Sequence, residues 1–167
     1  MATPQNLFTR LMGMSDDVWL RHTNPLSVWS RILLSLPILT LSIWSRAWIG
    51  FYAIVAIGLS LFWLWINPRL FPVPKNTNNW ASQGVLGERL WINRKKVPVP
   101  REHVYAGTAL MCISLLGFPF YIYGLYQLDF WPMLFGFTLI YMGKLWYFDR
   151  MVWLYREMRV KNSNSCN

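Results

Sequence analysis

Residues 47–66 read AWIGFYAIVAIGLSLFWLWI, an apolar stretch without a charged or amide side chain. At about 1.5 Å per residue, a helix over this stretch is about 30 Å long, which is the hydrocarbon thickness of a bilayer. A helix on the surface of a soluble protein carries a polar stripe, and this stretch carries none. Arg46 precedes it and Asn67-Pro68-Arg69 follows it, so both ends are polar. The stretch predicts a transmembrane helix.

The composition of the whole chain also indicates a membrane protein, because 54% of its residues are hydrophobic and 17% are aromatic. Many of the eleven tryptophans fall at the ends of apolar segments, as in the aromatic belts of membrane interfaces. The net charge of +9 is placed beside those segments, which favours anionic lipid headgroups over nucleic acid. Cys112 lies in an apolar segment and Cys166 in the tail, so no disulfide is predicted. The first residues show no signal-peptide pattern.

Around the apolar stretch the sequence predicts an all-α polytopic membrane protein with four transmembrane helices in two hairpins. Its predicted parts are an N-terminal cytoplasmic or interfacial segment (1–24), a first transmembrane hairpin (25–66), a long cytoplasmic loop (67–103), a second hairpin with an extended last helix (104–160) and a disordered tail (161–167).

The first span is predicted to begin at Asn24-Pro25, because asparagine accepts a hydrogen bond from a free backbone N–H and proline suits the first helical position. Pro37 is expected to kink this helix. Its strictly apolar part is short, so spanning requires Arg31 to extend toward the headgroups, and a re-entrant segment is the alternative. Ser45-Arg46-Ala47 leaves room only for a tight turn. Asn67-Pro68-Arg69 is expected to end the second helix.

The loop over residues 67–103 is the longest predicted connection. Pro-Val-Pro units at 72–74 and 98–100 bracket it and favour extended backbone. Between them, residues 80–92 predict a short helix lying in the interface, and Arg94-Lys95-Lys96 follows that helix. A connection of this length is often functional.

The basic residues predict the orientation of the four helices. Fifteen of the sixteen Lys and Arg residues then lie on one side of the membrane, and only Arg46 lies on the other. The positive-inside rule makes the first side cytoplasmic, with both termini there. Three spans would divide the basic residues between the two sides.

Small residues recur at helical spacing within the predicted spans. Such residues share one helix face and let neighbouring helices approach closely in lipid. The pairs are Gly117 with Gly124, Gly136 with Gly143, and Ala56 with Ser60.

Both histidines are predicted at the same membrane depth, His22 just before the first span and His103 just before the third. Together with Glu88 they are the candidates for acid–base catalysis or ligand binding, because imidazole changes charge near neutral pH. No HExxH or histidine-rich pattern accompanies them, so the sequence predicts no metal and no cofactor. The plainer interpretation is two histidines at a membrane surface.

A second set of residues on the same face offers cations, amides and an indole to a lipid headgroup or other ligand, because guanidinium binds phosphate in a bidentate fork. These candidates are Arg21, Asn24, Arg31, Asn67, Arg69, Trp80 and Arg89. The positive-inside signal alone also accounts for the arginines. A charge beside lipid is costly unless it is paired, so we expect Glu88 to contact Arg21 or Arg31 and the regions around His22 and residues 80–89 to form one site.

Three motifs together resemble a family of small, mainly bacterial membrane proteins that is described as a domain of unknown function. They are WLRHTNPLSVWSR at 19–31, NPRLFP at 67–72 and WASQGVLGER at 80–89. The resemblance is close over residues 18–89 and looser over the last two spans. It implies no activity, but it suggests that the cytoplasmic-side elements characterise the family.

Two functional hypotheses follow. The first is a non-catalytic protein of the bacterial inner membrane that binds membrane lipids, a protein partner or a second copy through its basic, Trp-rich cytoplasmic face, and binds no nucleic acid. The second is a membrane-embedded enzyme that acts on a lipidic substrate at that face, using His22, Glu88 and His103. The absence of a catalytic motif favours the first. Convergence of these three side chains in one pocket would favour the second.

Overall fold

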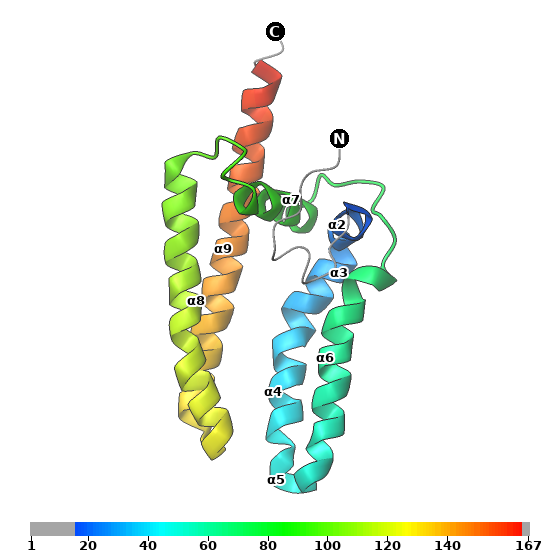
Figure 1. Cartoon of the computed structure of the whole chain (residues 1–167), viewed down its shortest axis with the longest axis vertical. Helices are drawn as coiled ribbons and strands as arrows, with labels where there is room; N and C mark the ends of the chain where they lie inside the picture. Colours follow the sequence, from blue (N-terminus) through cyan, green and yellow to red (C-terminus); the bar gives the residue numbers. More distant parts are fainter. Residues whose placement is uncertain (1–15, 165–167) are drawn as a thin grey trace.

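The computed structural model describes residues 16–164, and every regular element in that range is helical. The expected all-α class is therefore confirmed, while the expectations for residues 1–15 and 165–167 lie outside the described residues. Figure 1 shows two long helical hairpins with a shorter helix, α7, lying across one end of them. The elements are α2 (Asp16–His22), α3 (Pro25–Ser30), the π-helical turn η1 (Arg31–Ser35), α4 (Leu36–Trp44), α5 (Arg46–Ile49), the 3₁₀ turn η2 (Gly50–Tyr52), α6 (Ala53–Leu70), α7 (Trp80–Ile92), α8 (Arg101–Gln127) and α9 (Phe130–Asn164).

The first hairpin begins where the sequence predicts, with the Asn24 Oδ1 accepting a 3.0 Å hydrogen bond from the Leu26 N–H. The irregularity expected at Pro37 takes the form of the π-helical turn η1, which immediately precedes it. A proline ring crowds the carbonyl four residues earlier and offers that carbonyl no N–H. A widened turn at this position relieves both problems. It keeps residues 25–44, the first of the two helical arms of this hairpin, continuous.

The turn of this hairpin is longer than predicted. α5 and η2 occupy residues 46–52, so α6 starts at Ala53, and Gly50 has a φ of 55° that glycine adopts without strain. At its other end α6 runs through Pro68 to Leu70, although we expected Asn67-Pro68-Arg69 to end it. A proline in the last turn of a helix removes one hydrogen bond and leaves the preceding turns intact.

The second hairpin packs its two helices in close contact, as the glycine spacing predicts. A Cβ at Gly124 would lie 2.2 Å from the Met133 N, and a Cβ at Gly136 would lie 2.3 Å from the Tyr121 N. Leu128, with a φ of 56°, separates α8 from α9. α9 continues to Asn164, so residues 161–164 are helical rather than part of the expected disordered tail.

The helix predicted over residues 80–92 is α7, and it packs against α9. The Asn79 Oδ1 accepts a 2.9 Å hydrogen bond from the Ser82 N–H and caps its first turn. A Cβ at Gly87 would lie 1.9 Å from the carbonyl oxygen of Met151, so the two helix backbones meet there. Val85 is buried in the core that α7 shares with Phe148 of α9.

Contacts along the arms also join the two hairpins. The hydroxyls of Thr40 and Tyr121 share a 2.7 Å hydrogen bond, and the Tyr141 hydroxyl donates to the carbonyl of Ile32. At the far turn, the Arg46 Nη2 donates to the Leu125 carbonyl at 2.5 Å. That carbonyl belongs to the last turn of α8, where a cation is favourable.

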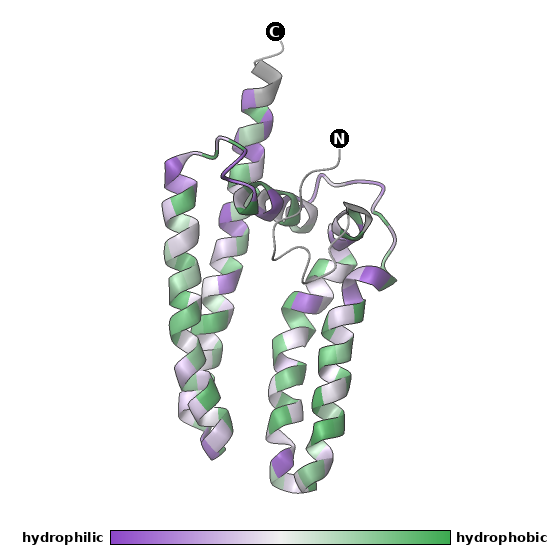
Figure 2. Ribbon diagram, viewed as in Figure 1, coloured by the Kyte–Doolittle hydropathy of each residue, from purple (hydrophilic) through white to green (hydrophobic). Residues whose placement is uncertain are grey.

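The described residues include two helical segments that are long and apolar enough to cross a membrane, Pro25–Leu70 and Arg101–Gln127. The first of these contains both arms of the first hairpin. α9 is not among them, since Lys144 and several tryptophans and tyrosines interrupt its apolar part. Figure 2 shows apolar residues along the arms and hydrophilic residues gathered around α7 and the adjoining helix ends.

Candidate functional site

His22 and Arg31 lie together where α2 meets the first hairpin. The Arg31 Nη1 donates to the His22 Nε2 at 2.5 Å, and the Arg31 Nε donates to the Ser27 carbonyl at 3.1 Å. Burial first, and then the charges of Arg31 and Lys144, lower the pKa of His22 well below its ordinary value of 6.5. The imidazole is therefore neutral at pH 7. Because its Nε2 accepts from Arg31, its proton is on Nδ1, which is buried without a partner among the described residues.

Glu88 joins this region from α7, but with a partner that the sequence did not predict. The Lys144 Nζ of α9 donates to the Glu88 Oε1 at 3.1 Å, in place of the expected Arg21 or Arg31. The positive charge of Lys144 also interacts with His22, and the negative charge of Glu88 also interacts with Arg31. We call His22, Arg31, Glu88 and Lys144 the charge cluster. It combines two cations, one anion and a neutral imidazole from four different elements.

The two candidate asparagines hold the helices that carry this cluster. The Asn24 Nδ2 donates to the Pro72 carbonyl at 2.9 Å, while its Oδ1 caps α3. Asn67, which is fully buried, accepts a 2.8 Å hydrogen bond from the Ser27 hydroxyl and donates one of 2.8 Å to the Ser30 hydroxyl. These bonds tie α3 to α6 and satisfy both amides within the fold.

Trp80 anchors the start of α7 between the hairpins. Its Nε1 donates to the Asp149 Oδ1 at 2.8 Å, and its ring stacks on Trp29 with centroids 5.3 Å apart. Two residues later, the Ser82 hydroxyl donates to the Thr23 carbonyl at 2.6 Å. The region of His22 and the region of residues 80–89 therefore meet, as the sequence predicts.

The remaining candidate arginines occupy separate positions. The Arg69 guanidinium lies over the Trp65 ring at 4.4 Å from the centroid and donates to the Trp65 carbonyl. Arg21 lies in the last turn of α2, and Arg89 lies in the last turn of α7. Both are partly exposed.

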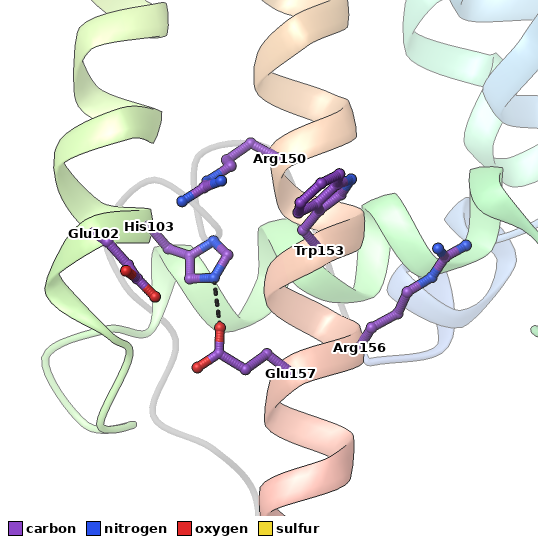
Figure 3. A pocket seen from close by; sticks show the side chains of 6 residues that line it. All are labelled: Glu102, His103, Arg150, Trp153, Arg156 and Glu157. Carbon is purple, nitrogen blue, oxygen red and sulfur yellow. Dashed lines mark hydrogen bonds and ion pairs between the residues drawn. The ribbon is translucent and has the colours of Figure 1, made fainter.

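His103, the third catalytic candidate, lies in a different site. Its Nε2 is 2.9 Å from the Glu157 Oε2, and the ring is 3% exposed. None of its hydrogen bonds or ion pairs involves His22 or Glu88, so the structure does not bring these three side chains together. It lines an open cleft of about 520 Å³ between the first turn of α8 and the extension of α9 (Figure 3). The cleft residues are Glu102, His103, Arg150, Trp153, Arg156 and Glu157.

Of the residues that line this cleft, only His103 was among the candidates named from the sequence. Arg150, Trp153 and Glu157 are spaced three and four positions apart, which places them on one face of a helix. That spacing was a usable signal, because the apolar pattern of the fourth span already ends before it. The pairing of this face with His103 depends on the register of α8 against α9.

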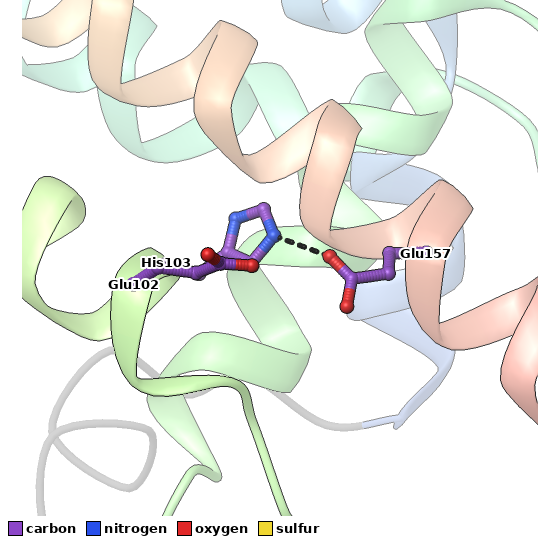
Figure 4. Close-up of side chains that lie close together, drawn as sticks. All are labelled: Glu102, His103 and Glu157. Carbon is purple, nitrogen blue, oxygen red and sulfur yellow. Dashed lines mark hydrogen bonds and ion pairs between the residues drawn. The ribbon is translucent and has the colours of Figure 1, made fainter.

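Glu102, His103 and Glu157 also form a group whose ligand atoms lie within 4.8 Å of one another (Figure 4). The carboxylate of Glu157 is already engaged by two partners, since its Oε1 accepts from the Lys161 Nζ at 2.6 Å. These hydrogen bonds lower the pKa of Glu157, so it is ionised at neutral pH. Arg150 and Arg156 line the same cleft and oppose a cation there.

The comparison with known proteins gives a family and no activity. No curated protein and no solved structure matches the chain. The profile of one protein family matches residues 4–167 and so covers both hairpins as well as the three motifs noted above. The chain belongs to that family, which is described as a family of unknown function (DUF6653).

Proposed function

We propose that this protein is an integral membrane protein of the bacterial inner membrane, with four spans and both termini on the cytoplasmic side. In this proposal, it binds anionic lipid headgroups with the basic turn, which we define as Arg94, Lys95 and Lys96. The observation that carries the proposal is the position of this turn. It follows α7 directly, its three side chains are exposed, and α7 lies across the ends of both hairpins (Figure 1).

The exposed surface of the arms supports placement in a membrane. Only 11% of the most apolar window of the first segment and 22% of that of the second are buried within the protein, whereas a core helix of a soluble protein is mostly buried. α6 has 18 residues, about 27 Å of helix, which approaches the thickness of the hydrocarbon layer. Exposed apolar side chains along the arms include Ile54, Leu59, Trp65, Leu116 and Ile122.

Aromatic and basic side chains at the α7 end support an interface there. Trp29, Trp146 and Trp153 are exposed near the ends of the arms, and indole rings favour the headgroup level of a bilayer. Lysine and arginine side chains next to an anionic leaflet contribute about 1 kcal/mol each to its binding. The Arg94 guanidinium lies 3.9 Å from the centroid of the buried Trp91 ring, so the basic turn packs against α7.

Lipid binding is supported over catalysis by the separation of the candidate residues. The enzyme hypothesis needs His22, Glu88 and His103 in one pocket. His22 and Glu88 belong to the charge cluster, whereas His103 pairs with Glu157 in the cleft.

Native mass spectrometry of the delipidated protein, with phosphatidylglycerol or phosphatidylcholine added back, tests the proposal. Lys95→Gln/Lys96→Gln removes two charges from the basic turn and should weaken phosphatidylglycerol binding about tenfold or more. The matched control is Lys75→Gln/Arg159→Gln, which removes two charges at exposed positions outside the basic turn and should leave that binding within about twofold. Equal retention of both lipids by the unaltered protein would contradict the proposal.

A further inference from the structure

We infer that the cleft between α8 and the extension of α9 binds a phosphate group, with His103 and Arg150 as its hydrogen-bond partners. The cleft has about 520 Å³, within the range of small-molecule sites. The inference does not depend on the proposed function, because the residues of the basic turn do not line the cleft.

Two nitrogen atoms in the lining of the cleft carry the argument. The His103 Nδ1 and the Arg150 Nε are both buried and have no hydrogen-bond partner among the described residues. Buried polar groups are paired in the great majority of cases, so two unpaired ones in one cleft indicate a missing partner. In Figure 3, Arg150 lies on the side of the imidazole ring away from Glu157.

The hydrogen bond to Glu157 determines what His103 offers to that partner. An ionised carboxylate only accepts hydrogen bonds, so the proton on the His103 Nε2 points to the Glu157 Oε2. The Nδ1 then donates to a phosphate oxygen when the ring is protonated and accepts from a P–OH group when it is neutral. A phosphate ester that carries one proton fits either state.

The cleft is lined by two carboxylates and two guanidinium groups, so the preference for an anion depends on which of these charges are already engaged. Both oxygens of Glu157 are engaged, one by His103 and the other by Lys161. Glu102 lies in the first turn of α8, where the helix dipole already stabilises its charge. Arg150 and Arg156 remain as cations on the walls, and the Arg156 Nε is oriented by a 2.8 Å hydrogen bond to the Gln83 Oε1. The planar guanidinium group offers parallel N–H donors that match the geometry of a phosphate.

The chain has only two histidines, so ¹⁵N-histidine NMR of the full-length protein in detergent tests the site directly. Inorganic phosphate, added at constant ionic strength and pH 7, should shift the His103 signal in a saturable way and leave the His22 signal in place. His103→Gln assigns the signals by removing one of them. A parallel shift of both signals would overturn the inference, and the titration itself is run on the unaltered protein.

Substitutions then identify the donors. Arg150→Gln should weaken phosphate binding at least tenfold, whereas Lys75→Gln, which also removes one positive charge at an exposed loop position, should leave it within about twofold. Unchanged binding in a folded Arg150→Gln protein would remove Arg150 from the site. A His103 shift produced by submillimolar Zn²⁺ but not by phosphate would overturn the inference in favour of a cation site.

An experiment with lipids distinguishes a phosphate that belongs to a lipid headgroup from one that belongs to a soluble ester. Nanodiscs that contain phosphatidic acid, in buffer without phosphate, are compared with nanodiscs of phosphatidylcholine alone. A His103 shift with phosphatidic acid identifies a lipid headgroup, and a shift with inorganic phosphate only identifies a soluble ester. Both outcomes support a phosphate site, and a shift with neither probe contradicts it.

Discussion

Gly87 of α7 lies directly against the backbone of Met151 in α9, where a Cβ would stand 1.9 Å from the Met151 carbonyl oxygen. This contact fixes the helix that crosses the two hairpins, because backbone atoms, unlike a flexible side chain, cannot move aside. Met151 itself is fully buried in the core that α7 covers. The position of α7, and of the basic turn after it, thus depends on a glycine.

Gly87→Ala should lower the stability of the protein by about 1–3 kcal/mol, the usual cost of overpacking a well-packed contact. Thermal unfolding in detergent measures the effect. Gly58→Ala on α6 is the control, since a Cβ there meets nothing within 4 Å and alanine favours helix. Equal midpoints for Gly87→Ala and the unaltered protein would contradict the contact.

Gly136→Leu should force α8 and α9 apart and cost at least about 1–3 kcal/mol. Gly143→Leu is expected to cost less, because its nearest obstacle is the Ser114 N at 2.9 Å, whereas Gly136 meets the Tyr121 N at 2.3 Å. Thermal unfolding of both variants in one detergent gives the order. The reverse order would show that the glycine seam between α8 and α9, formed by Gly117, Gly124, Gly136 and Gly143, is not packed as described.

Asn67→Ala should cost about 1–3 kcal/mol, because it leaves the buried hydroxyl of Ser27 without its acceptor and removes the donor to Ser30. Asn76→Ala, at an exposed position in the loop, should be nearly neutral. Unfolding midpoints compare the two. A loss of lipid binding by Asn67→Ala without a loss of stability would instead indicate that the amide contacts the ligand.

The stability of the protein should fall as the pH drops below about 6.5, in part because of His22. Its folded-state pKa is lowered, so the unfolded chain takes up a proton first, and its contribution to stability is complete above pH 6.5 and decreases below it. Unfolding midpoints between pH 7.5 and 5 should decrease less in His22→Gln, which keeps an acceptor for Arg31. Identical pH profiles for the two proteins would exclude His22 as a cause.

Cysteine-accessibility mapping tests the proposed topology, after replacement of Cys112 and Cys166. A cysteine at position 46 should be labelled from outside the cell, and one at position 95 only after the membrane is permeabilised, because positive-inside orientation places them on opposite sides. Labelling of position 95 from outside would reject the four-span arrangement.

Local signals in the sequence predicted the arms, the cap at Asn24, the helix over residues 80–92 and the glycine seam. Each of these depends on residues close together in the chain or on the regular period of a helix. The length of the first turn was not predicted, because Gly50 allows a positive φ without requiring it. The continuation of α6 through Pro68 depends on position within the last turn, which composition does not reveal.

The candidate site was predicted in part. The meeting of the His22 region with α7 was expected from the return of the chain to one face, and Ser82 with Thr23 confirms it. The partner of Glu88 depends on the register of α7 against α9, which brings Lys144 within 3.1 Å in place of Arg31. The pairing of His103 with Glu157 likewise depends on contacts between helices far apart in the sequence.

The packing of α7 on α9 also implies an order of events during synthesis. The first hairpin has its own internal bonds, such as Ser42 with Ser60 at 2.7 Å, and leaves the ribosome first. α7 follows, but it rests on the backbone of Met151 and the carboxylate of Asp149, which are made only after α8. The apolar face of α7 therefore stays uncovered until the last helix is complete. Truncation within α9 should expose this face to proteolysis while the bonds within the first hairpin remain in place.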